Sequence, residues 1–360
     1  RSIPAADAVA QSLNALKALQ DAGCVRFFFK YCSTFDSTDA GNIGPVGDAL
    51  LDALMAKQAI YCPAFPVNGR TIFFGHLFVG DVLLSDSHMK HHPLTPMTDA
   101  SLVRVLARQT PHKVGLVALK QVQSGSAVLR ESLDKLAAEG VRHVVVDAVA
   151  DTDLGIIGEA IGDDTLVTGG SGVALGLPAA YRRRGLMQHK AGADALPKID
   201  GTPAVLAGSC SAATLGQIAA FKGPHLALDT DAICRGEDVA GKALAWAREK
   251  VGTAPILLSA SDTPDAVKAL QAKYGIEKSS LAIEKTMAAL ARGLVEAGVG
   301  RLVVAGGETS GAVVSALDVT ALRIGPEIDP GVPWTASVGA RPILLALKSG
   351  NFGAPDFFTK

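Results

Sequence analysis

The stretch VVAGGETSGAVVSAL, residues 303–317, joins an apolar run to a helix-like pattern through a turn of small residues. Gly306 and Gly307 end the apolar run, and a Glu-Thr-Ser-Gly sequence follows them. A strand that enters a helix through such a turn exposes backbone N–H groups at the helix N-terminus, where anions bind readily. The stretch therefore predicts one strand–turn–helix unit of an α/β fold, with a phosphate site at the turn.

The composition narrows the class of protein. The chain has 360 residues, 48% of them hydrophobic, and a formal net charge of −1. This length favours two domains, and the balanced charge gives no basic surface for nucleic acid. No apolar run approaches the roughly 18 residues of a membrane span, so we expect no membrane partner. The five cysteines include no Cys-x-x-Cys pair, which predicts reduced thiols and a cytoplasmic location.

Outside the opening stretch, helix-like and strand-like segments alternate, which is typical of mostly parallel sheets covered by helices. In the first half, the pattern predicts helices near 9–22, 44–57 and 126–140, and strands at 24–29, 59–65, 112–119 and 141–149. A polar segment at 182–203, rich in Gly and Pro, interrupts the pattern and predicts a linker. Further strands are predicted at 204–211, 255–261, 301–308 and 341–347. We therefore predict two α/β domains, residues 1–190 and 200–360.

Ligands of open parallel sheets bind beyond the carboxyl ends of the strands. Four such ends in the second domain carry small polar residues, at 208–211, 259–262, 306–311 and 348–351. Their N–H and O–H groups are suited to binding phosphates. The alternative for any single turn is that its glycines only permit a tight turn of the backbone. The chain contains no GxxxxGK[ST] motif, and the GGETSG turn lacks the GxGxxG spacing of dinucleotide folds. A nicotinamide-dependent dehydrogenase is therefore disfavoured.

In the first domain, KYCSTFDSTDAGNIGPV, residues 30–46, follows a predicted strand. It combines a cation, Lys30, with a carboxylate, Asp36, and several hydroxyl groups. This set suits a small polyhydroxy acid, with Lys30 for the carboxylate and Asp36 for the hydroxyls. The other candidates in the segment are Ser33, Thr34, Ser37, Thr38 and Asn42. The alternative is a loop whose side chains bond their own backbone.

Two further segments of the first domain carry candidate residues. PAFPVNGRT, residues 63–71, adds Asn68 and Arg70, and an arginine grips a carboxylate or phosphate with two hydrogen bonds. SHMKHHPLTPMTD, residues 87–99, contains three histidines, but no carboxylate or cysteine completes an obvious zinc site. We therefore predict no metal site there, and a substrate-loop role that includes His91, with a plain surface loop as the alternative.

Taken together, several motifs resemble the four-carbon acid sugar kinase family, with the closest likeness to its 3-oxo-tetronate kinases. The resemblance covers essentially the whole chain, in the family's motif order. The motifs are FKYCSTFDST, GNIGPV, PAFPVNGRT, HHPLTPMTD, LVTGGSG, GSCS, VAGGETSGAVV, IGPEIDPGVPW and LALKSGNFG. The resemblance implies an N-terminal domain that binds the sugar acid, a C-terminal domain that binds ATP, and an active site in the cleft between them.

Carried over by motif, the resemblance implies that the loops at 30–42 and 68–70 form the acid-sugar site. The residues implied for the nucleotide are Ser209, Ser211, Gly306, Gly307, Glu308, Thr309, Ser310 and Gly350. Family members open with a strand that ends in an Asp-Asp-x-Thr-Gly-Ala motif, which this chain does not contain. We expect that the sequence is trimmed at its N-terminus.

The predicted reaction transfers the γ-phosphoryl group of ATP to the C4 hydroxyl of the acid. Glu308 would contact Mg²⁺, directly or through water, and Lys30 or Arg70 would grip the carboxylate. Asp36 is the candidate proton acceptor, in competition with the absent aspartates. A kinase for D-threonate, L-threonate or D-erythronate is the alternative within the class. A non-catalytic sensor of sugar acid and nucleotide is the alternative from another class, and a homodimer is compatible with either.

Overall fold

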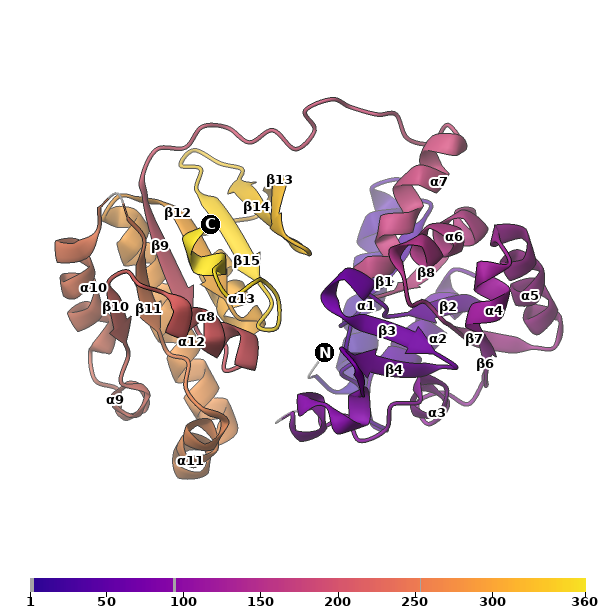
Figure 1. Ribbon diagram of the computed structural model, residues 1–360, viewed down its shortest axis with the longest axis horizontal. Coiled ribbons are helices and arrows are strands. Elements are labelled where there is room, and N and C mark those ends of the chain that lie inside the picture. Colours follow the sequence, from indigo (N-terminus) through magenta and orange to yellow (C-terminus); the bar gives the residue numbers. More distant parts are fainter. Residues whose placement is uncertain (1–2, 93–94, 253) are drawn as a thin grey trace. The chain divides into compact units, whose positions relative to one another are not determined.

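The computed structural model describes residues 3–92, 95–252 and 254–360. The chain divides into two compact units, residues 1–189 and 190–360. Both units are α/β, as the alternating pattern predicts, and each contains a sheet whose strands are mostly parallel (Figure 1). No helix within the described ranges is long and apolar enough to cross a membrane.

The first unit is built on a five-stranded parallel sheet in the order β1-β8-β2-β7-β6. Its strands are β1 (Phe27–Lys30), β2 (Ala59–Cys62), β6 (Lys113–Val117), β7 (Val141–Val146) and β8 (Leu166–Gly169). Its helices are α1 (Ala5–Asp21), α2 (Ile43–Ala53), α3 (Leu102–Ala107), α4 (Leu119–Gln123), α5 (Ser126–Ala138), α6 (Asp151–Ile161) and α7 (Leu177–Arg183). Because all five strands run the same way, their carboxyl ends meet at one edge.

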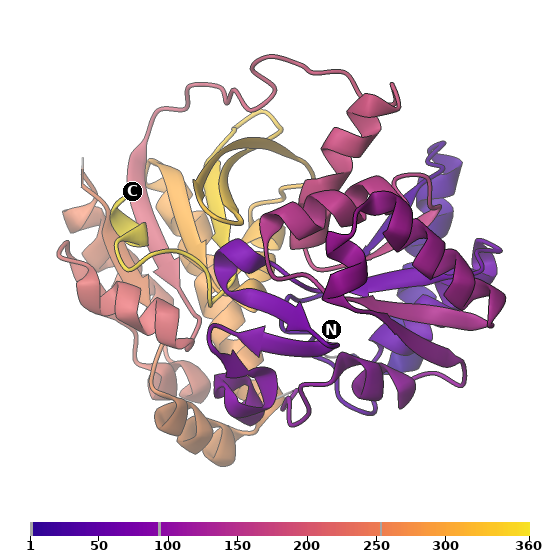
Figure 2. The same cartoon turned by 45° about the vertical axis from the view of Figure 1, so that its right-hand side comes forward.

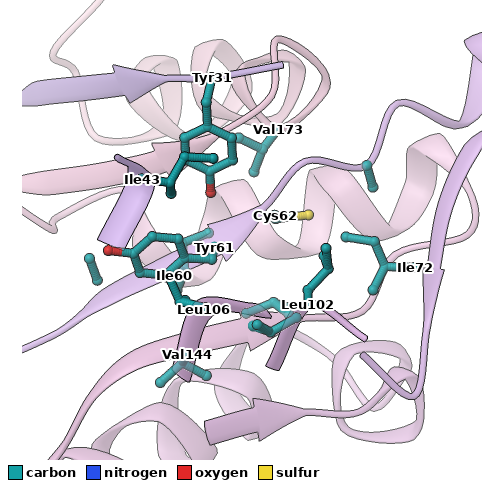
Figure 3. Close-up of a cluster of buried hydrophobic side chains, with 14 of the residues drawn as sticks. Tyr31, Ile43, Ile60, Tyr61, Cys62, Ile72, Leu102, Leu106, Val144 and Val173 are labelled. Carbon is teal, nitrogen blue, oxygen red and sulfur yellow. The ribbon is translucent and has the colours of Figure 1, made fainter. Parts of the chain in front are cut away.

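The core of this unit lies around β2, the central strand (Figure 3). All four residues of β2 are buried, which explains why the strand reads as an uninterrupted apolar run. Tyr61 keeps its hydroxyl satisfied by contacting His143 Nδ1 at 2.9 Å, and His143 Nε2 in turn contacts Asp48 Oδ1 at 2.7 Å. A connected chain of polar side chains therefore crosses this core from β2 through β7 to α2.

A small antiparallel sheet, which the sequence pattern did not predict, interrupts this unit between β2 and α3 (Figure 2). It consists of β3 (Arg70–Phe73), β4 (His76–Val79) and β5 (Val82–Leu83). Ile72 exchanges two backbone hydrogen bonds with Ala148, just beyond β7. The buried Asp147 carboxylate accepts the N–H groups of Phe74 and Gly75 at 2.7 and 2.8 Å. These bonds hold the small sheet at the edge where the parallel strands end.

The second unit contains a seven-stranded sheet in the order β10-β11-β9-β12-β15-β14-β13. Its strands are β9 (Thr202–Ala207), β10 (His225–Ala227), β11 (Ile256–Ser259), β12 (Val299–Ala305), β13 (Leu322–Asp329), β14 (Val332–Ser337) and β15 (Leu344–Lys348). The first five in spatial order are parallel, and β14 and β13 are antiparallel. The β13–β14 hairpin was not predicted from the sequence.

The helices of this unit are α8 (Ala212–Ala220), α9 (Thr230–Arg235), α10 (Val239–Lys250), α11 (Pro264–Tyr274), α12 (Ile276–Glu296) and α13 (Gly307–Ala316). α12 buries Met287, Leu290 and Leu294 in the same cluster as Leu206 and Val304 of the sheet. Residues at alternate positions point to the other face, where they meet Phe357 and Phe358. Both faces of the central strands are therefore covered.

Candidate functional site

Three loops of the second unit follow neighbouring strands. Residues 208–211 follow β9, Gly306 follows β12, and residues 349–351 follow β15. β12 pairs with β9 on one side and with β15 on the other, so the three loops leave the sheet side by side. The convergence predicted from the small polar residues thus has a geometric basis in the strand order. The fourth predicted strand end, at 259–262, follows β11, which lies on the far side of β9.

Glycines let these loops approach one another. A Cβ added to Gly208 would lie 2.2 Å from the Thr309 hydroxyl oxygen, and one added to Gly350 would lie 2.2 Å from the Ser209 hydroxyl oxygen. Gly306 has φ +127°, and a Cβ there would lie 3.2 Å from the backbone nitrogen of Ser209. Ser209, Thr309 and the three glycines Gly208, Gly306 and Gly350 therefore form one contiguous surface that side chains would disrupt.

The two helices that begin at this surface differ at their N-termini. α8 is capped by Ser211, whose hydroxyl accepts the Thr214 N–H at 3.2 Å. α13 has Gly306 at its N-cap and no side-chain cap. The first N–H groups of α13 are therefore left for solvent or for an anion, which the positive end of the helix dipole favours.

The remaining residues predicted on α13 lie in different environments. Glu308 is exposed in the first turn, and Thr309 is buried. The Ser310 hydroxyl oxygen is buried without a hydrogen-bond partner among the described residues. Glu284 of α12 was not singled out in the sequence, yet burial and the neighbouring Glu308 raise its pKa. Two carboxylates of different helices thus lie close to the start of α13.

Two buried residues behind the loops were given no role in the sequence analysis, although one of them, Lys348, lies in the predicted strand end at 348–351. Lys348 ends β15, is 1% exposed, and donates to the Thr214 hydroxyl at 3.0 Å and to the Gly350 carbonyl at 2.9 Å. Thr214 donates to the same carbonyl at 2.9 Å. Ser211, which was predicted as a ligand contact, also donates to it, at 2.5 Å. The signal in the sequence was a lysine at the end of an apolar strand, where a core residue is expected.

In the first unit, the predicted polar loop after β1 is mostly buried. Ser33, Thr34, Asp36, Ser37 and Asn42 are each less than 9% exposed. The Thr34 hydroxyl donates to Asp36 Oδ1 at 2.5 Å. Phe35 and Asp36 both adopt positive φ, at 61° and 24°. Non-glycine residues in this region are strained and concentrate at functional sites.

Gln109 fixes the second half of the same loop. Its Nε2 donates to the Ser37 hydroxyl at 2.9 Å and to the Thr38 carbonyl at 2.6 Å, and its Oε1 accepts the Gly44 N–H at 2.9 Å. Asn42 donates to the Ile3 carbonyl at 3.2 Å. The Ser37 hydroxyl, the Thr38 carbonyl and the Asn42 amide are therefore bonded to residues outside the loop.

Arg70 lies at the start of β3 and is 8% exposed. Its Nη1 donates to the Asn68 carbonyl, and its Nε is buried with no partner among the described residues. Burial lowers the pKa of Arg70, while the nearby Cys32 and Asp36 oppose that shift. A buried guanidinium with an unused donor is suited to an anionic ligand, because such a group is costly when left unpaired.

The histidine that accompanies this arginine is His88. Burial and the charge of Arg70 lower the pKa of His88, and Asp36 opposes the shift. His91, which the sequence analysis preferred, is exposed on the short helix His88–His91. Pro93 and Leu94 of the same segment lie outside the described residues. Within the described part of the chain, no group of three or more His, Cys, Asp or Glu side chains could hold a metal ion.

A cavity of about 290 Å³ lies beside the loop after β1. Lys30, Asp36 and Asn42 line it together with apolar residues of α1 and α2. Lys30 is itself exposed. The cavity thus brings together the predicted cation, the predicted carboxylate and one predicted amide, and its volume suits a small polar molecule.

Comparison with known proteins assigns a description to each half of the chain. Residues 1–177 match the family described as "Sugar-binding N-terminal domain", and residues 204–358 match "Nucleotide-binding C-terminal domain". The chain is 57% identical to a 3-oxo-tetronate kinase of Burkholderia multivorans, covering all of this chain and 84% of that protein. It is also 57% identical to one of Cupriavidus necator, covering 99% of this chain and 83% of that protein.

Two solved structures, neither of them named as a kinase, share the fold of this chain. A crystal structure of a Salmonella typhimurium LT2 protein superposes with a TM-score of 0.84 at 42% identity, covering 99% of this chain and 85% of that one. A Haemophilus influenzae protein superposes with a TM-score of 0.72 at 46% identity, covering 99% and 86%. The fold is therefore shared over the whole length compared.

Proposed function

Because this chain belongs to the four-carbon acid sugar kinase family, we propose that it transfers the γ-phosphoryl group of ATP to the C4 hydroxyl of a four-carbon acid sugar, 3-oxo-tetronate. The relatives named 3-oxo-tetronate kinase, 47–57% identical over at least 99% of this chain, support the choice of substrate. The observation that carries the proposal is the contiguous surface of Ser209, Gly306, Thr309 and Gly350 beside the uncapped start of α13.

On the second unit, the first N–H groups of α13 and the Ser209 hydroxyl would bind the phosphates of ATP. Glycines at positions 208, 306 and 350 let these donors lie close together. The positive end of the α13 dipole adds favourable electrostatics. Phosphoryl transfer needs mainly positioning and charge stabilisation, which such fixed donors supply.

The carboxylates near the start of α13 fit a hydrated Mg²⁺, which prefers oxygen ligands and keeps several waters. Glu308 is exposed, and Glu284 is close enough for Glu308 to raise its pKa. We propose that Glu308 holds the ion directly or through water, with Glu284 as a second acceptor for its waters. When bound, the ion would neutralise phosphate charge.

On the first unit, Arg70 would bind the carboxylate of the acid through its unused Nε–H. The Asp36 carboxylate, beside Arg70 and lining the cavity with Lys30, would accept hydrogen bonds from the hydroxyl groups. Lys30 is exposed and lines the cavity, so it would act as a second cation at the cavity mouth.

In the transfer step, the C4 oxygen forms a bond to the γ-phosphorus while the bond from that phosphorus to the ADP oxygen breaks. The proton of the C4 hydroxyl passes to a carboxylate, for which Asp36 is our candidate. The products are the acid 4-phosphate and ADP, and the negative charge that gathers on the transferring oxygens is met by the N–H donors of α13.

The test is ADP release with Mg-ATP and, separately, 3-oxo-tetronate, D-threonate, L-threonate and D-erythronate. Turnover with 3-oxo-tetronate at a kcat/KM at least tenfold above the other acids is expected. Preference for a reduced acid would retain the kinase chemistry and reject the substrate. Binding of ATP with no turnover of any of the four would instead favour a sensor.

A further inference from the structure

The loop that follows β15 turns its carbonyl groups toward α8. Lys348 Nζ donates to the Ser349 and Gly350 carbonyls at 3.2 and 2.9 Å. Further along the loop, Gln217 Nε2 donates to the carbonyl oxygens of residues 352–354, all within 3.1 Å. Gln217 is 1% exposed, so this arrangement is set by the interior of the unit rather than by solvent.

A trans peptide is planar, and its C=O and N–H groups point in opposite directions. The chain has no cis peptide among its described residues. Because the Ser349 and Gly350 carbonyls are held inward, the N–H groups of Gly350 and Asn351 point outward. Neither N–H donates to any described residue, and both residues are partly exposed. Adjacent outward N–H groups form an anion-binding concavity.

The Lys348 ammonium has no counter-ion in the part of the chain that the structure describes. It is surrounded by three neutral oxygens, and no carboxylate of the described residues lies within ion-pair distance. The side chain is 1% exposed, and a buried ammonium without an anion is costly. The three oxygens match the three donors of a protonated amine, so the site is built for the charged form.

We propose that Lys348 is a positioning residue of the nucleotide site: its buried ammonium holds the Ser349 and Gly350 carbonyls inward, so that the N–H groups of Gly350 and Asn351 bind a nucleotide phosphate. The inference rests on the proposed binding of ATP to this surface. The bound phosphate supplies the missing negative charge from the opposite side of the same two peptide groups.

Burial lowers the pKa of Lys348 to about 7. An anion beside the loop favours the protonated form, so nucleotide binding takes up a proton above neutral pH. Affinity therefore falls as pH rises above 7 and levels off once the pH passes the higher pKa of the bound state. The other charged or titratable groups on the elements around β15 include Cys210, Arg301, Glu308 and the ion pair of Asp329 with Lys360, while α8 carries none.

The experiment compares Lys348→Met with the parent protein by calorimetric titration of Mg-ADP and of adenosine, at pH 7.0, 8.0 and 9.0. Lys242→Met, an exposed lysine of α10, is the matched control. We expect Lys348→Met to weaken Mg-ADP binding at least tenfold at pH 7.0 and adenosine binding less than twofold. Proton uptake on binding of Mg-ADP, measured in two buffers of different ionisation enthalpy, should be lost in Lys348→Met and kept in Lys242→Met.

A folded Lys348→Met that binds Mg-ADP within twofold of the parent would overturn the inference, as would equal losses for Mg-ADP and adenosine. If that variant does not fold, Thr214→Val removes the hydroxyl that links Lys348 to the Gly350 carbonyl and keeps the lysine. A threefold or greater selective loss of Mg-ADP binding is then expected, and an unchanged affinity rejects the role. A parent protein that binds no Mg-ADP would instead reject the proposed nucleotide site.

Discussion

The Ser209 hydroxyl occupies the space that a side chain on Gly350 would need. A Cβ at Gly350 would lie 2.2 Å from Ser209 Oγ and 3.1 Å from Ser211 Oγ. Ser211 donates to the carbonyl of Gly350 at 2.5 Å, so it cannot move without losing that bond. The loops after β9 and β15 can therefore pack this closely only because residue 350 has no side chain.

Gly350→Ala should separate these two loops. We expect a KM for ATP raised about tenfold, because overpacking of this kind costs about 1–3 kcal/mol, and a KM for the acid within twofold. Gly216→Ala is the control, since Gly216 lies in α8 with open space around it. Steady-state kinetics with each substrate varied in turn checks the prediction, and equal changes in both KM values would contradict it.

Adjacent glycines at the start of α13 should respond differently to alanine. Gly306 has φ +127° and close neighbours, whereas a Cβ on Gly307 meets nothing within 4 Å. Gly306→Ala should lower the free energy of unfolding by about 1–3 kcal/mol. Gly307→Ala should change it by less than about 0.5 kcal/mol. Urea unfolding of both variants measures this, and similar losses would show that the turn is not set by Gly306.

The space around Gly307 also bears on the phosphate site. A Cβ on Gly307 meets no heavy atom within 4 Å outside its chain neighbours and its own helix backbone, so a valine there would crowd a bound ligand rather than a packed side chain. Gly307→Val should therefore raise the KM for ATP more than the KM for the acid without loss of stability, which steady-state kinetics and urea unfolding of the variant check.

Arg70→Lys should weaken binding of the acid. Lysine removes the planar guanidinium and its Nε–H, and a hydrogen bond to a charged group is worth about 1.5–3 kcal/mol. We expect the KM for the acid to rise about tenfold to a hundredfold, with the KM for ATP unchanged. Arg104→Lys is the control, because Arg104 is an exposed partner of Asp99 in the same unit. A normal acid KM in Arg70→Lys would place the carboxylate elsewhere, with Lys30 as the next candidate.

Asp48→Asn should reduce stability in a pH-dependent way. Burial raises the pKa of Asp48, but hydrogen bonds from His143 and Thr110 and the histidine charges outweigh it, so the pKa falls below its ordinary value of 3.8. The folded state therefore favours the carboxylate, and this contribution is present above the unfolded pKa and lost as pH falls through the folded pKa.

The measurement is the urea midpoint of the parent and of Asp48→Asn between pH 7 and pH 3. At pH 7 we expect the free energy of unfolding of Asp48→Asn to be about 1–3 kcal/mol lower than that of the parent. This difference should shrink below pH 4. Asp134→Asn, which affects an exposed ion pair with Arg130, should change stability by less than about 0.5 kcal/mol. A pH-independent difference for Asp48→Asn would show that the charge of Asp48 is not the cause.

The sequence alone determined the fold class, because the periods of apolar residues are local and survive without tertiary context. The helix predicted near 126–140, for example, is α5, Ser126–Ala138. The hairpins of β3–β5 and β13–β14 were missed, since their short strands mix polar and apolar residues and pair antiparallel at the edges. An alternation of apolar and polar residues is weak evidence for a strand when it extends over only four to eight residues.

The site residues likewise divide into those that the local sequence predicts and those that depend on tertiary contacts. A glycine-rich turn after an apolar strand is visible in the sequence, so the positions around Gly306 were predicted as a phosphate turn and stay a proposal. Contacts such as those of Lys348 with Thr214, or of Gln109 with Ser37, join segments distant in the chain. Only the folded chain decides them, because burial and strand order determine which polar groups must satisfy one another, and neither is a property of a local stretch of sequence.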